Sequence, residues 1–482
     1  MEFVKNHIWQ ILIVLNYTIA LSAVATILLK KVNPTKALSY IIGLLALPFL
    51  GIIVYYLFGQ EYRKSKIFSR KNVLNQTVVK KIQQELELDT KEIDVVDDLL
   101  DEKAKLIPLL YNNEKSKLTI NNEVTLIKNG DDKFELLFED LASAKHHIHL
   151  EYFIIKDDKI GTELLNILCK KSEEGVKIRI AIDDVGSSIS SKMKRKIKDS
   201  GIEMYPFMPV LFSKFTGQMN YRDHRKIIVI DGKIGYIGGV NISDSYVNAN
   251  NERYWRDTHL RVVGEAVKPL QILFFTTWDF VSEGQSEISK AYFPEHDCKA
   301  NVPIQIAASG PDTDWSNIME AIFIGITNAE DHVYITTPYF IPNPEIVTAL
   351  QVIARSNKEV KIIVPKESDS WIAEYATNSY LELLLEAGVE VYRYTKGFIH
   401  AKTMVVDGVF STVGTTNMDY RSFNINFEIN ALVYNKDISR QLTEFFNDDL
   451  KDCEKLELES WQKRSKRTKL IEAVARLMAP LL

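Results

Sequence analysis

Two long apolar runs open the chain. Residues 8–29 and residues 37–58 each hold 22 residues without a charged side chain, and KKVNPTK separates them. A helix rises about 1.5 Å per residue, so such a run reaches about 33 Å and can cross a hydrocarbon core of about 30 Å. The pattern predicts a transmembrane helical hairpin over residues 1–59, in which Pro48 kinks the second helix.

Basic residues near the two runs indicate an orientation. The loop between the runs carries three lysines, whereas six basic residues lie on the other side. These six are Lys5, Arg63, Lys64, Lys66, Arg70 and Lys71. Because basic residues gather on the cytoplasmic side, we expect both termini in the cytoplasm. A signal peptide is disfavoured because no small-residue cleavage site precedes the second run, while an interfacial hairpin that does not span stays open.

The next segment, residues 60–117, is rich in charged side chains and holds an acidic cluster at residues 92–102. A charged segment with few large apolar residues cannot bury a core of its own. We therefore expect a solvated, helical linker between the membrane anchor and the rest of the chain.

From residue 118 the pattern alternates between apolar strands and amphipathic helices. ELLFEDLASAK, HHIHLEYFII, GTELLNILCKKSEEG and VKIRIAIDD follow one another as helix, strand, helix and strand. The same order returns with SNIMEAIFIGITNAE, HVYITTPYFI, PEIVTALQVIARSNK and VKIIVP. The repetition predicts an internal duplication, with two similar α/β domains over residues 118–297 and 298–482.

A constellation of polar residues occurs once in each half at identical spacing. It consists of His224, Lys226, Asp231, Gly238 and Asn241 in the first half and of His400, Lys402, Asp407, Gly414 and Asn417 in the second. Each His and Lys are two residues apart at the start of an apolar strand, so both side chains lie on one face. Asp-Gly after the strand predicts a hairpin turn. One such frame is weak evidence, but two matched frames indicate a shared function.

The paired HxKxxxxD frames resemble those of the phospholipase D superfamily. The neighbouring sequences WRDTHLRVVG, TPYFIP and GTTNMDYRSFNINFEINA are more narrowly similar to bacterial cardiolipin synthases. The resemblance implies that two phospholipase D-like domains share one cleft and that neither half is active alone. It also implies a multi-pass protein of the bacterial plasma membrane with its catalytic domains on the cytoplasmic side.

The implied reaction transfers a phosphatidyl group between two phosphatidylglycerol molecules, through a phosphatidyl-histidine, to give cardiolipin and glycerol. Such chemistry needs a nucleophile, a proton donor and positive charge around the phosphoryl oxygens. The two histidines can supply the first two, and Lys226 and Lys402, with Asn241 and Asn417, the third. No metal or cofactor is required. The alternative is a phospholipase D-type hydrolase or another phosphatidyltransferase with the same intermediate.

Each catalytic histidine needs a carboxylate on its second ring nitrogen to fix its tautomer. Glu428 is the candidate for His400. For the first half, an equal count leads to Glu252, whereas the match of WRDTHLRVV with NFEINALVY selects Asp257, which we prefer.

The assignment of the two histidines rests on the resemblance and on a local argument. In two-motif members the first-half histidine is usually the nucleophile, which indicates His224, with His400 as general acid. Arg222 and Arg225 would favour a neutral imidazole at His224, whereas His400 follows two apolar residues. We expect Asp231 and Asp407 mainly to brace the frames.

Composition narrows the possible partners. The net charge of −5 gives no basic signature for nucleic acid, and three widely spaced cysteines indicate free thiols in a reducing compartment. His146, His147 and His149 lack nearby carboxylates at ligand spacing, which favours a core or surface position over a metal site. The tail WQKRSKRTKLIEAVARLMAPLL predicts a basic amphipathic helix, which either binds anionic lipid or packs on the second domain. The oligomeric state stays open.

Overall fold

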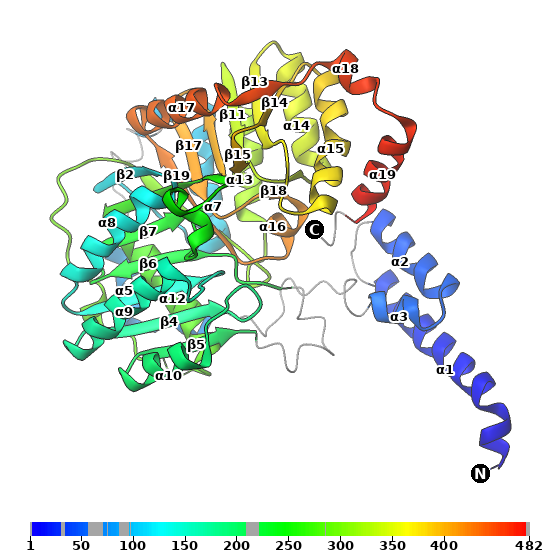
Figure 1. Cartoon of the computed structure of the whole chain (residues 1–482), viewed down its shortest axis with the longest axis horizontal. Helices are drawn as coiled ribbons and strands as arrows, with labels where there is room; N and C mark the ends of the chain where they lie inside the picture. The colour runs from blue at the N-terminus through cyan, green and yellow to red at the C-terminus, as the bar shows by residue number, and fades with distance from the viewer. Residues whose placement is uncertain are drawn as a thin grey trace. The chain divides into compact units, whose positions relative to one another are not determined.

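The computed structural model describes residues 2–29, 34–55, 71–74, 76–85, 96, 98–208, 221–284 and 286–478. The chain divides into two units (Figure 1). One comprises Met1–Tyr62 with Met208–Tyr221, and the other comprises Arg63–Phe207 with Arg222–Leu482.

The first unit contains helices α1 (Glu2–Leu29), α2 (Pro34–Ala46) and α3 (Leu50–Val54). Within the described residues, one helical segment is long and apolar enough to cross a membrane, His7–Leu29, with a mean hydropathy of 2.2. Ala20, Ala23 and Ile27 of α1 pack against Leu44 and Tyr55. The first apolar run therefore forms the helix that the sequence predicts.

The second apolar run differs from the expected spanning helix. Its helix ends at Ala46, and Phe49 takes a left-handed conformation with φ of 61° directly after Pro48. The chain then reverses. Tyr55 follows Tyr40 by 15 positions, and yet their rings lie only 5.8 Å apart. Proline lacks the N–H that a continuous helix requires. The result is two short helices side by side rather than one span of 22 residues.

The second unit contains two large sheets. The first has the order β2-β9-β7-β6-β3-β4-β5. Its strands are β2 (Asn122–Lys128), β3 (His147–Tyr152), β4 (Lys177–Asp183), β5 (Glu203–Phe207), β6 (Lys226–Ile230), β7 (Ile234–Gly238) and β9 (Thr258–Gly264). The helices of this half are α8 (Asn129–Ser143), α9 (Lys159–Glu173), α10 (Ser191–Asp199) and α12 (Val267–Val281).

The second sheet has the order β1-β10-β19-β17-β16-β11-β13-β14-β20. Its strands are β1 (Leu118–Thr119), β10 (Ile304–Ser309), β11 (His332–Thr336), β13 (Glu359–Pro365), β14 (Glu390–Tyr394), β16 (Thr403–Val406), β17 (Phe410–Gly414), β19 (Glu428–Tyr434) and β20 (Cys453–Lys455). The helices are α13 (Asn317–Thr327), α14 (Pro344–Arg355), α15 (Trp371–Glu386), α16 (Tyr420–Asn424), α17 (Lys436–Leu450), α18 (Leu458–Gln462) and α19 (Lys466–Leu477).

The two sheets repeat one arrangement. The series β9-β7-β6-β3-β4-β5 corresponds to β19-β17-β16-β11-β13-β14, with the same mixture of parallel and antiparallel neighbours. Side chains of β6, β7 and β9 join those of β10, β17 and β19 in one buried cluster. Burial of each such Val, Leu or Ile contributes about 1.5–3 kcal/mol. The predicted duplicated α/β fold is confirmed, and its halves share a core.

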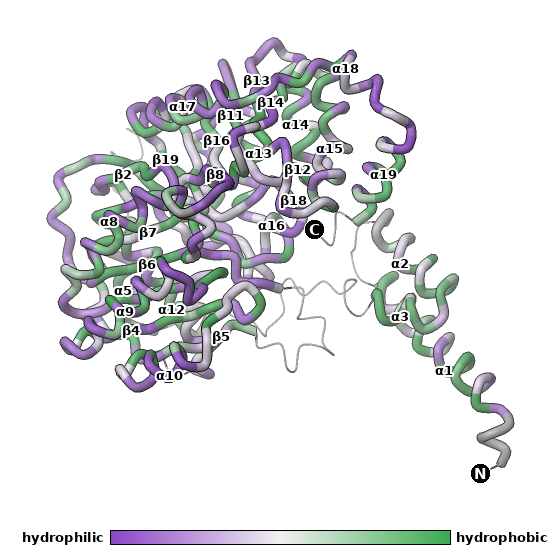
Figure 2. The backbone as a smooth tube through the Cα atoms, in the orientation of Figure 1, coloured by the Kyte–Doolittle hydropathy of each residue, from purple (hydrophilic) through white to green (hydrophobic). Residues whose placement is uncertain are grey.

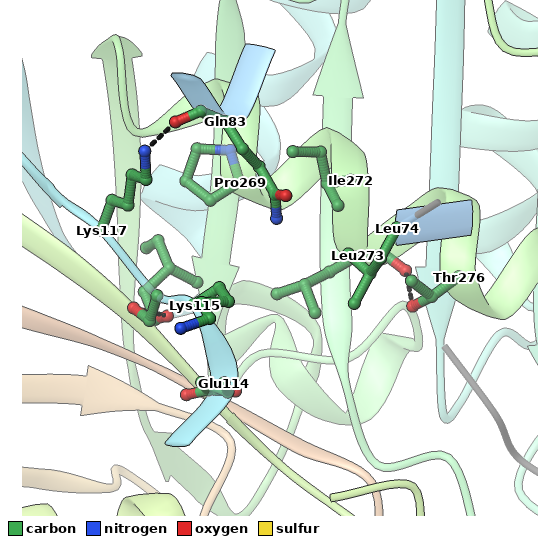
Figure 3. Close-up of a pocket in the computed structure, with 11 residues that line it drawn as sticks. Leu74, Gln83, Glu114, Lys115, Lys117, Pro269, Ile272, Leu273 and Thr276 are labelled. Atoms are coloured by element: carbon green, nitrogen blue, oxygen red, sulfur yellow. Dashed lines mark hydrogen bonds between the residues drawn. The ribbon is translucent and has the colours of Figure 1, made fainter. Parts of the chain in front are cut away.

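The segment expected to be a solvated linker is instead packed along both halves where it is described. Val73, Val79 and Ile82 lie in helices α4 (Lys71–Leu74) and α5 (Thr77–Glu85) and are buried in the aromatic cluster of α12. Figure 3 shows a cavity of about 50 Å³ between this segment and α12, where the ammonium of Lys117 donates to the carbonyl of Gln83.

The later part of this segment adds to the second half. The 3-10 helix η3 (Asp101–Lys105) and α7 (Leu106–Glu114) place buried side chains in the second-half core, and β1 pairs with β10. The charge content of the whole segment therefore concealed a packing surface.

Candidate active site

The two histidines precede matched central strands. His224 stands two residues before Lys226, the first residue of β6, and His400 lies between β15 (Gly397–Ile399) and β16. Both β6 and β16 run between two antiparallel neighbours and are buried along their length, apart from the half-buried Thr403. The β-branched runs IIVI and TMVV favour this central position. Each frame is thus fixed to the most rigid part of its sheet.

The backbone around each histidine is bonded to the other half of the chain. The N–H of His224 donates to the carbonyl of Phe427 at 3.0 Å, and the N–H of His400 donates to the carbonyl of Arg256 at 2.7 Å. The strand β15 also pairs in parallel with β8 (Tyr254–Arg256). Each histidine is therefore held in place only when both halves are folded together.

Both histidines line one pocket of about 310 Å³. Asn241, Tyr246, Trp255, Tyr339 and Asn426 also line it. The ring of Phe153 lies edge-on to His224 with a centroid distance of 5.0 Å, and Tyr246 lies edge-on to His400 at 5.6 Å. The duplication has brought the two frames to one site.

The carboxylates that the sequence selects do contact the histidines, but in crossed pairs. Nδ1 of His224 lies 3.0 Å from both carboxylate oxygens of Glu428, and Nδ1 of His400 lies 2.7 Å from Oδ2 of Asp257. The prediction that Glu428 pairs with His400 and Asp257 with His224 is wrong. It assumes that each carboxylate serves the histidine of its own half, whereas each carboxylate contacts the histidine of the other half. Glu252 is exposed and outside both pairs.

The crossed pairs determine which ring nitrogen is free. An ionised carboxylate only accepts hydrogen bonds, so the proton of each neutral imidazole resides on Nδ1. The unprotonated Nε2 then carries a lone pair at the pocket that both rings line. Burial raises the pKa of Glu428, but His224 and Thr415 together hold it below its ordinary value. Both rings are thereby prepared to take or give a proton at Nε2.

The two lysines lie directly behind the histidines. The ammonium of Lys226 donates to the carbonyl of His224 at 2.8 Å, and that of Lys402 donates to the carbonyl of His400 at 2.5 Å. Burial lowers the pKa of Lys226 to about 8, against the attraction of Glu428 and Asp257. Burial lowers the pKa of Lys402 further, to about 7, and the nearby Lys226 adds to the shift. An anion between these ammonium groups would relieve their repulsion.

The histidines are held neutral at physiological pH. Burial lowers the pKa of His224 to about 4, opposed by Glu428 and assisted by Lys226 and Lys402. Burial and Lys402 lower the pKa of His400 to about 4, opposed by Asp257. The cations that act most on His224 are therefore these lysines. Arg222 instead lies 3.4 Å from Asp183, so the local argument from neighbouring arginines does not distinguish the histidines.

The two asparagines occupy matched but unequal places. Asn241 lines the pocket, donates from Nδ2 to the Tyr246 hydroxyl at 2.5 Å, and accepts from the N–H of Ile154 at 3.3 Å. Asn417 is buried at the end of β17, and its Oδ1 lacks a hydrogen-bond partner among the described residues. Of the two, Asn241 is the one among the residues that line the pocket.

The aspartates of the frames lie at the far ends of β6 and β16, roughly 16 Å from the lysines along the strand. Asp231 accepts from the N–H groups of Lys145, His146 and His147. Asp407 accepts from three consecutive N–H groups of residues 330–332 and forms a buried ion pair with Lys103 at 2.7 Å. These contacts join the turn after each strand to the start of its neighbour.

Sequence reasoning missed the side chains that support the crossed pairs. Thr415 donates to Glu428 at 2.5 Å, and Asn426 donates to it at 3.4 Å. A Cβ added to Gly239 would lie 2.0 Å from Oδ1 of Asp257, so only glycine allows that carboxylate its position. These residues lie within the sequences GTTN, NINFE and GGVN, and that position beside the motif residues was the available signal.

The three clustered histidines of β3 belong to the packing of the first half. His147 and His149 are buried, and each ring lies within hydrogen-bond distance of Gln271. The ring of His149 also stacks on Phe274 with a centroid distance of 4.4 Å. His146 is exposed at the start of the strand. The cluster is therefore a core and surface group, consistent with the preferred interpretation of the sequence.

The comparisons with known proteins agree with this geometry. The family model described as "Cardiolipin synthase, PLD-like domain" matches residues 137–273 and 322–450, and the model "Phospholipase D-nuclease N-terminal" matches residues 18–60. The chain is 38% identical to a cardiolipin synthase of Geobacillus sp. (strain WCH70), over 100% of this chain and 96% of the relative. It is 37% identical to a cardiolipin synthase of Listeria monocytogenes serotype 4a (strain HCC23), over 99% of both.

A solved structure shares the fold. The phosphatidylserine synthase of Haemophilus influenzae Rd KW20 superposes with a TM-score of 0.59 and 15% identity, covering 79% of this chain and 98% of that one. The family models together match more than half of the chain, in two segments that each hold one frame. The chain therefore belongs to the bacterial cardiolipin synthases of the phospholipase D superfamily.

Proposed function

We propose that this pocket transfers a phosphatidyl group from one phosphatidylglycerol molecule to the free glycerol hydroxyl of a second, forming cardiolipin and releasing glycerol. The observation that carries the proposal is the pair of histidines on one pocket, each with its Nδ1 on a buried carboxylate and its Nε2 free. This arrangement suits a nucleophile and a general acid acting on one phosphodiester. The family makes the protein a phosphatidyltransferase.

The first half-reaction uses the two rings in different states. The Nε2 lone pair of His224 attacks phosphorus, the bond from phosphorus to the glycerol oxygen breaks, and that oxygen takes a proton from Nε2 of His400. Binding of the anionic diester beside Lys226 and Lys402 raises the pKa of both imidazoles, which lets one of them hold the required proton. The lysines and Asn241 carry the charge on the phosphoryl oxygens.

The second half-reaction reverses these transfers. The incoming glycerol hydroxyl gives its proton to Nε2 of His400, its oxygen attacks phosphorus, and the P–N bond to His224 breaks. Because one phosphodiester replaces another, the protein's own residues balance every proton and no net hydrolysis occurs. Asp257 and Glu428 keep each ring in one orientation throughout.

The experiment that tests this function follows the lipid products. Detergent-purified protein incubated with phosphatidylglycerol alone should yield cardiolipin and glycerol in equal amounts, measured by mass spectrometry and an enzymatic glycerol assay. A hydrolase built on the same intermediate would yield phosphatidic acid instead, because water would take the place of the second lipid. Phosphatidic acid without cardiolipin would overturn the proposal.

The membrane arrangement is a further part of the proposal. We place the catalytic halves on the cytoplasmic side, since a second run that crosses leaves six basic residues there against three. If the run instead reverses at Pro48 without crossing, Lys30, Lys31 and Lys36 join the five basic residues of positions 63–71, and Lys5 alone lies opposite. Both arrangements support the same side for the pocket.

Cysteine labelling from outside intact cells separates these arrangements. A cysteine near Asn33 that is labelled, with one near Ser65 protected, indicates two crossings. Protection at both positions indicates reversal at Pro48, and labelling near Ser65 would overturn the cytoplasmic assignment. The division into domains at residues 118–297 and 298–482 also stays a proposal, because β1 lies in the sheet of the second half and β8 pairs with β15 across the boundary.

A further inference from the structure

Helix α19 near the end of the chain presents two different faces. Glu472 and Ala475 are buried toward α15, whereas Leu470, Val474 and Leu477 are exposed at 66%, 55% and 79%. Spacings of four and three residues put the exposed side chains in one stripe. The backbone trace of α19 holds both hydrophilic and hydrophobic residues (Figure 2). Together with Met478 and with Trp371, which is 66% exposed at the start of α15, these residues form a surface that we name the apolar lip.

The inner face fixes α19 firmly to the second half. Arg464 forms an ion pair with the buried Glu472 and lies 3.8 Å from Glu382 of α15, to which Lys469 is bonded at 3.1 Å. At the other end, Ala475 packs in a cluster with Ala373. The exposed stripe is therefore the outer face of a helix that is already docked, and no unfolding is needed to present it.

On α19 itself the exposed charges have one sign, whereas Asp369 is exposed beside Trp371. Lys463, Lys466, Arg467 and Arg476 are exposed on the segment that carries the stripe. The single acidic residue of α19, Glu472, is buried and engaged by Arg464. Apolar side chains flanked by exposed cations, without exposed acids on the same helix, match the interface of a bilayer that carries anionic head groups.

The lip adjoins the active-site pocket. The cluster that receives Ala475 also contains Tyr339, and Tyr339 lines the pocket with His224 and His400. The hydroxyl of Tyr339 donates to Asp369 at 2.6 Å, and Asp369, another lining residue, precedes Trp371 by two positions. One wall of the pocket is thus continuous with the surface that holds the apolar lip.

We propose that the apolar lip inserts into the head-group region of an anionic bilayer and holds the pocket opening at the level of the lipid phosphates. The inference rests on the proposed function, because it assumes that phospholipids are the substrates. In this proposal α19 and Trp371, rather than the membrane anchor, hold the pocket opening at the bilayer surface. Apolar insertion supplies the depth, and the flanking cations select anionic lipid.

The test measures contact with lipid at single positions in the full chain, reconstituted in vesicles. Cys298 and Cys453 are replaced by serine, and an environment-sensitive fluorophore is attached to Leu477→Cys or, as a matched exposed control on α17, to Arg440→Cys. In vesicles with 30–40% phosphatidylglycerol, nitroxide lipids should quench the label at position 477 at least threefold more than at position 440. The difference should shrink in neutral vesicles.

Equal, weak quenching at both positions would overturn the proposal. A label at 477 that is shielded from aqueous quenchers but not quenched by lipid would also overturn it, because a second copy or another part of the chain would then cover the stripe. Quenching of the same strength in neutral vesicles would contradict the role given to the cations.

Activity supplies the second arm. Val474→Glu with Leu477→Glu should lower turnover of long-chain phosphatidylglycerol in vesicles at least tenfold, while turnover of a short-chain, monomeric phosphatidylglycerol stays within twofold. Equal loss with both substrates would mean a structural role and would overturn the inference. Failure of the proposed function looks different, because the parent protein would then make no cardiolipin from either substrate.

Discussion

The surroundings of His224 and His400 show which parts of the duplicated site are alike and which differ. Both rings have Nδ1 on a buried carboxylate from the other half, and both have a lysine on their own carbonyl oxygen. The carboxylate is Glu428 at one ring and Asp257 at the other. The histidines and lysines are thus matched between the halves, and each histidine is bonded to a carboxylate from the other half.

The layers behind the two rings differ in charge. Behind His224, Arg225 and Thr277 contact Glu151 in the buried interior, and burial raises the pKa of Glu151 and of Asp223. The matching positions of the second half hold Thr336, Ile399 and Ala401, by motif spacing and strand register. The buried network of Arg225 and Glu151 is therefore not repeated at the matching positions of the second half, where Arg256 and Asp449 instead form a buried ion pair next to His400.

The duplication thus preserved the histidines and lysines, whereas the residues packed behind them diverged. Crossed carboxylates make the halves interdependent, since each ring loses its tautomer control without the other half. The experiments below test how equivalent the two rings are.

The largest effect is expected from removing either ring. His224→Ala and His400→Ala should each lower cardiolipin synthesis by at least about 10⁴-fold, because a nucleophile or an acid is lost outright. Lipid mass spectrometry over long incubations measures the residual rate. Retention of more than one per cent of activity in either variant would contradict the two-histidine mechanism.

The same variants assign the roles. A donor whose leaving group needs no proton should still form a lipid adduct in His400→Ala but not in His224→Ala. Peptide mass spectrometry after acid quenching locates the adduct. Its appearance on His400 in the parent protein would reverse the assignment and would make the polar network behind His224 a feature of the acid.

Next in size are the carboxylates. Glu428→Gln and Asp257→Asn keep the shapes but remove the charge that fixes each tautomer, and each should lower kcat on the order of 10³-fold. The crossed geometry predicts that Asp257→Asn resembles His400→Ala and still forms the adduct with the activated donor, whereas Glu428→Gln does not. If Glu428→Gln formed the adduct and Asp257→Asn did not, each carboxylate would instead serve the histidine of its own half.

The comparison also explains what the sequence could predict. Two frames with equal spacing, in α/β halves of the same element order, were sufficient for the duplicated fold and for the two histidines that line one pocket. Apolar periodicity identifies strands and helices because it reflects burial within one element. The crossed pairing of Asp257 and Glu428 was beyond reach, because it depends on how the halves dock.

Two other features required the structure for similar reasons. The reversal at Pro48 depends on a left-handed Phe49 and on contacts such as Tyr40 with Tyr55, which a hydropathy pattern does not encode. The packed segment before residue 118 turns its apolar residues inward, and even the charged Lys103 is buried there, paired with Asp407. Composition alone indicated a linker, because a count of charged residues does not show which residues face the core.

A smaller effect separates the two lysines by pH. A lysine whose pKa is lowered loses its charge as pH rises through that value, so affinity for a soluble phosphodiester should weaken above about 7 at Lys402 and again above about 8 at Lys226. Each step should raise the inhibition constant up to about tenfold per pH unit. Competitive inhibition by glycerophosphoglycerol from pH 6 to 9 measures it.

Arginine variants provide the matched controls, since arginine keeps its charge in this range. Lys402→Arg should remove the step near pH 7, and Lys226→Arg the step near pH 8. If both variants show the parental pH profile, the lysines do not carry the charge that binds the diester.

The smallest effect concerns the positions beside the two carboxylates. Thr415 donates to Glu428, and its counterpart Gly239 lies against Asp257 without a side chain. Thr415→Val removes one hydrogen bond to a charged acceptor, worth about 1.5 kcal/mol or more, so kcat should fall at least about 10-fold with KM nearly constant. Thr415→Ser retains the hydroxyl and should stay within twofold of the parent. Because Glu428 serves His224, adduct formation with the activated donor should slow by the same factor, measured by rapid quench. An unchanged adduct rate with slower turnover would assign the effect of Thr415 to the other ring and would contradict the crossed arrangement.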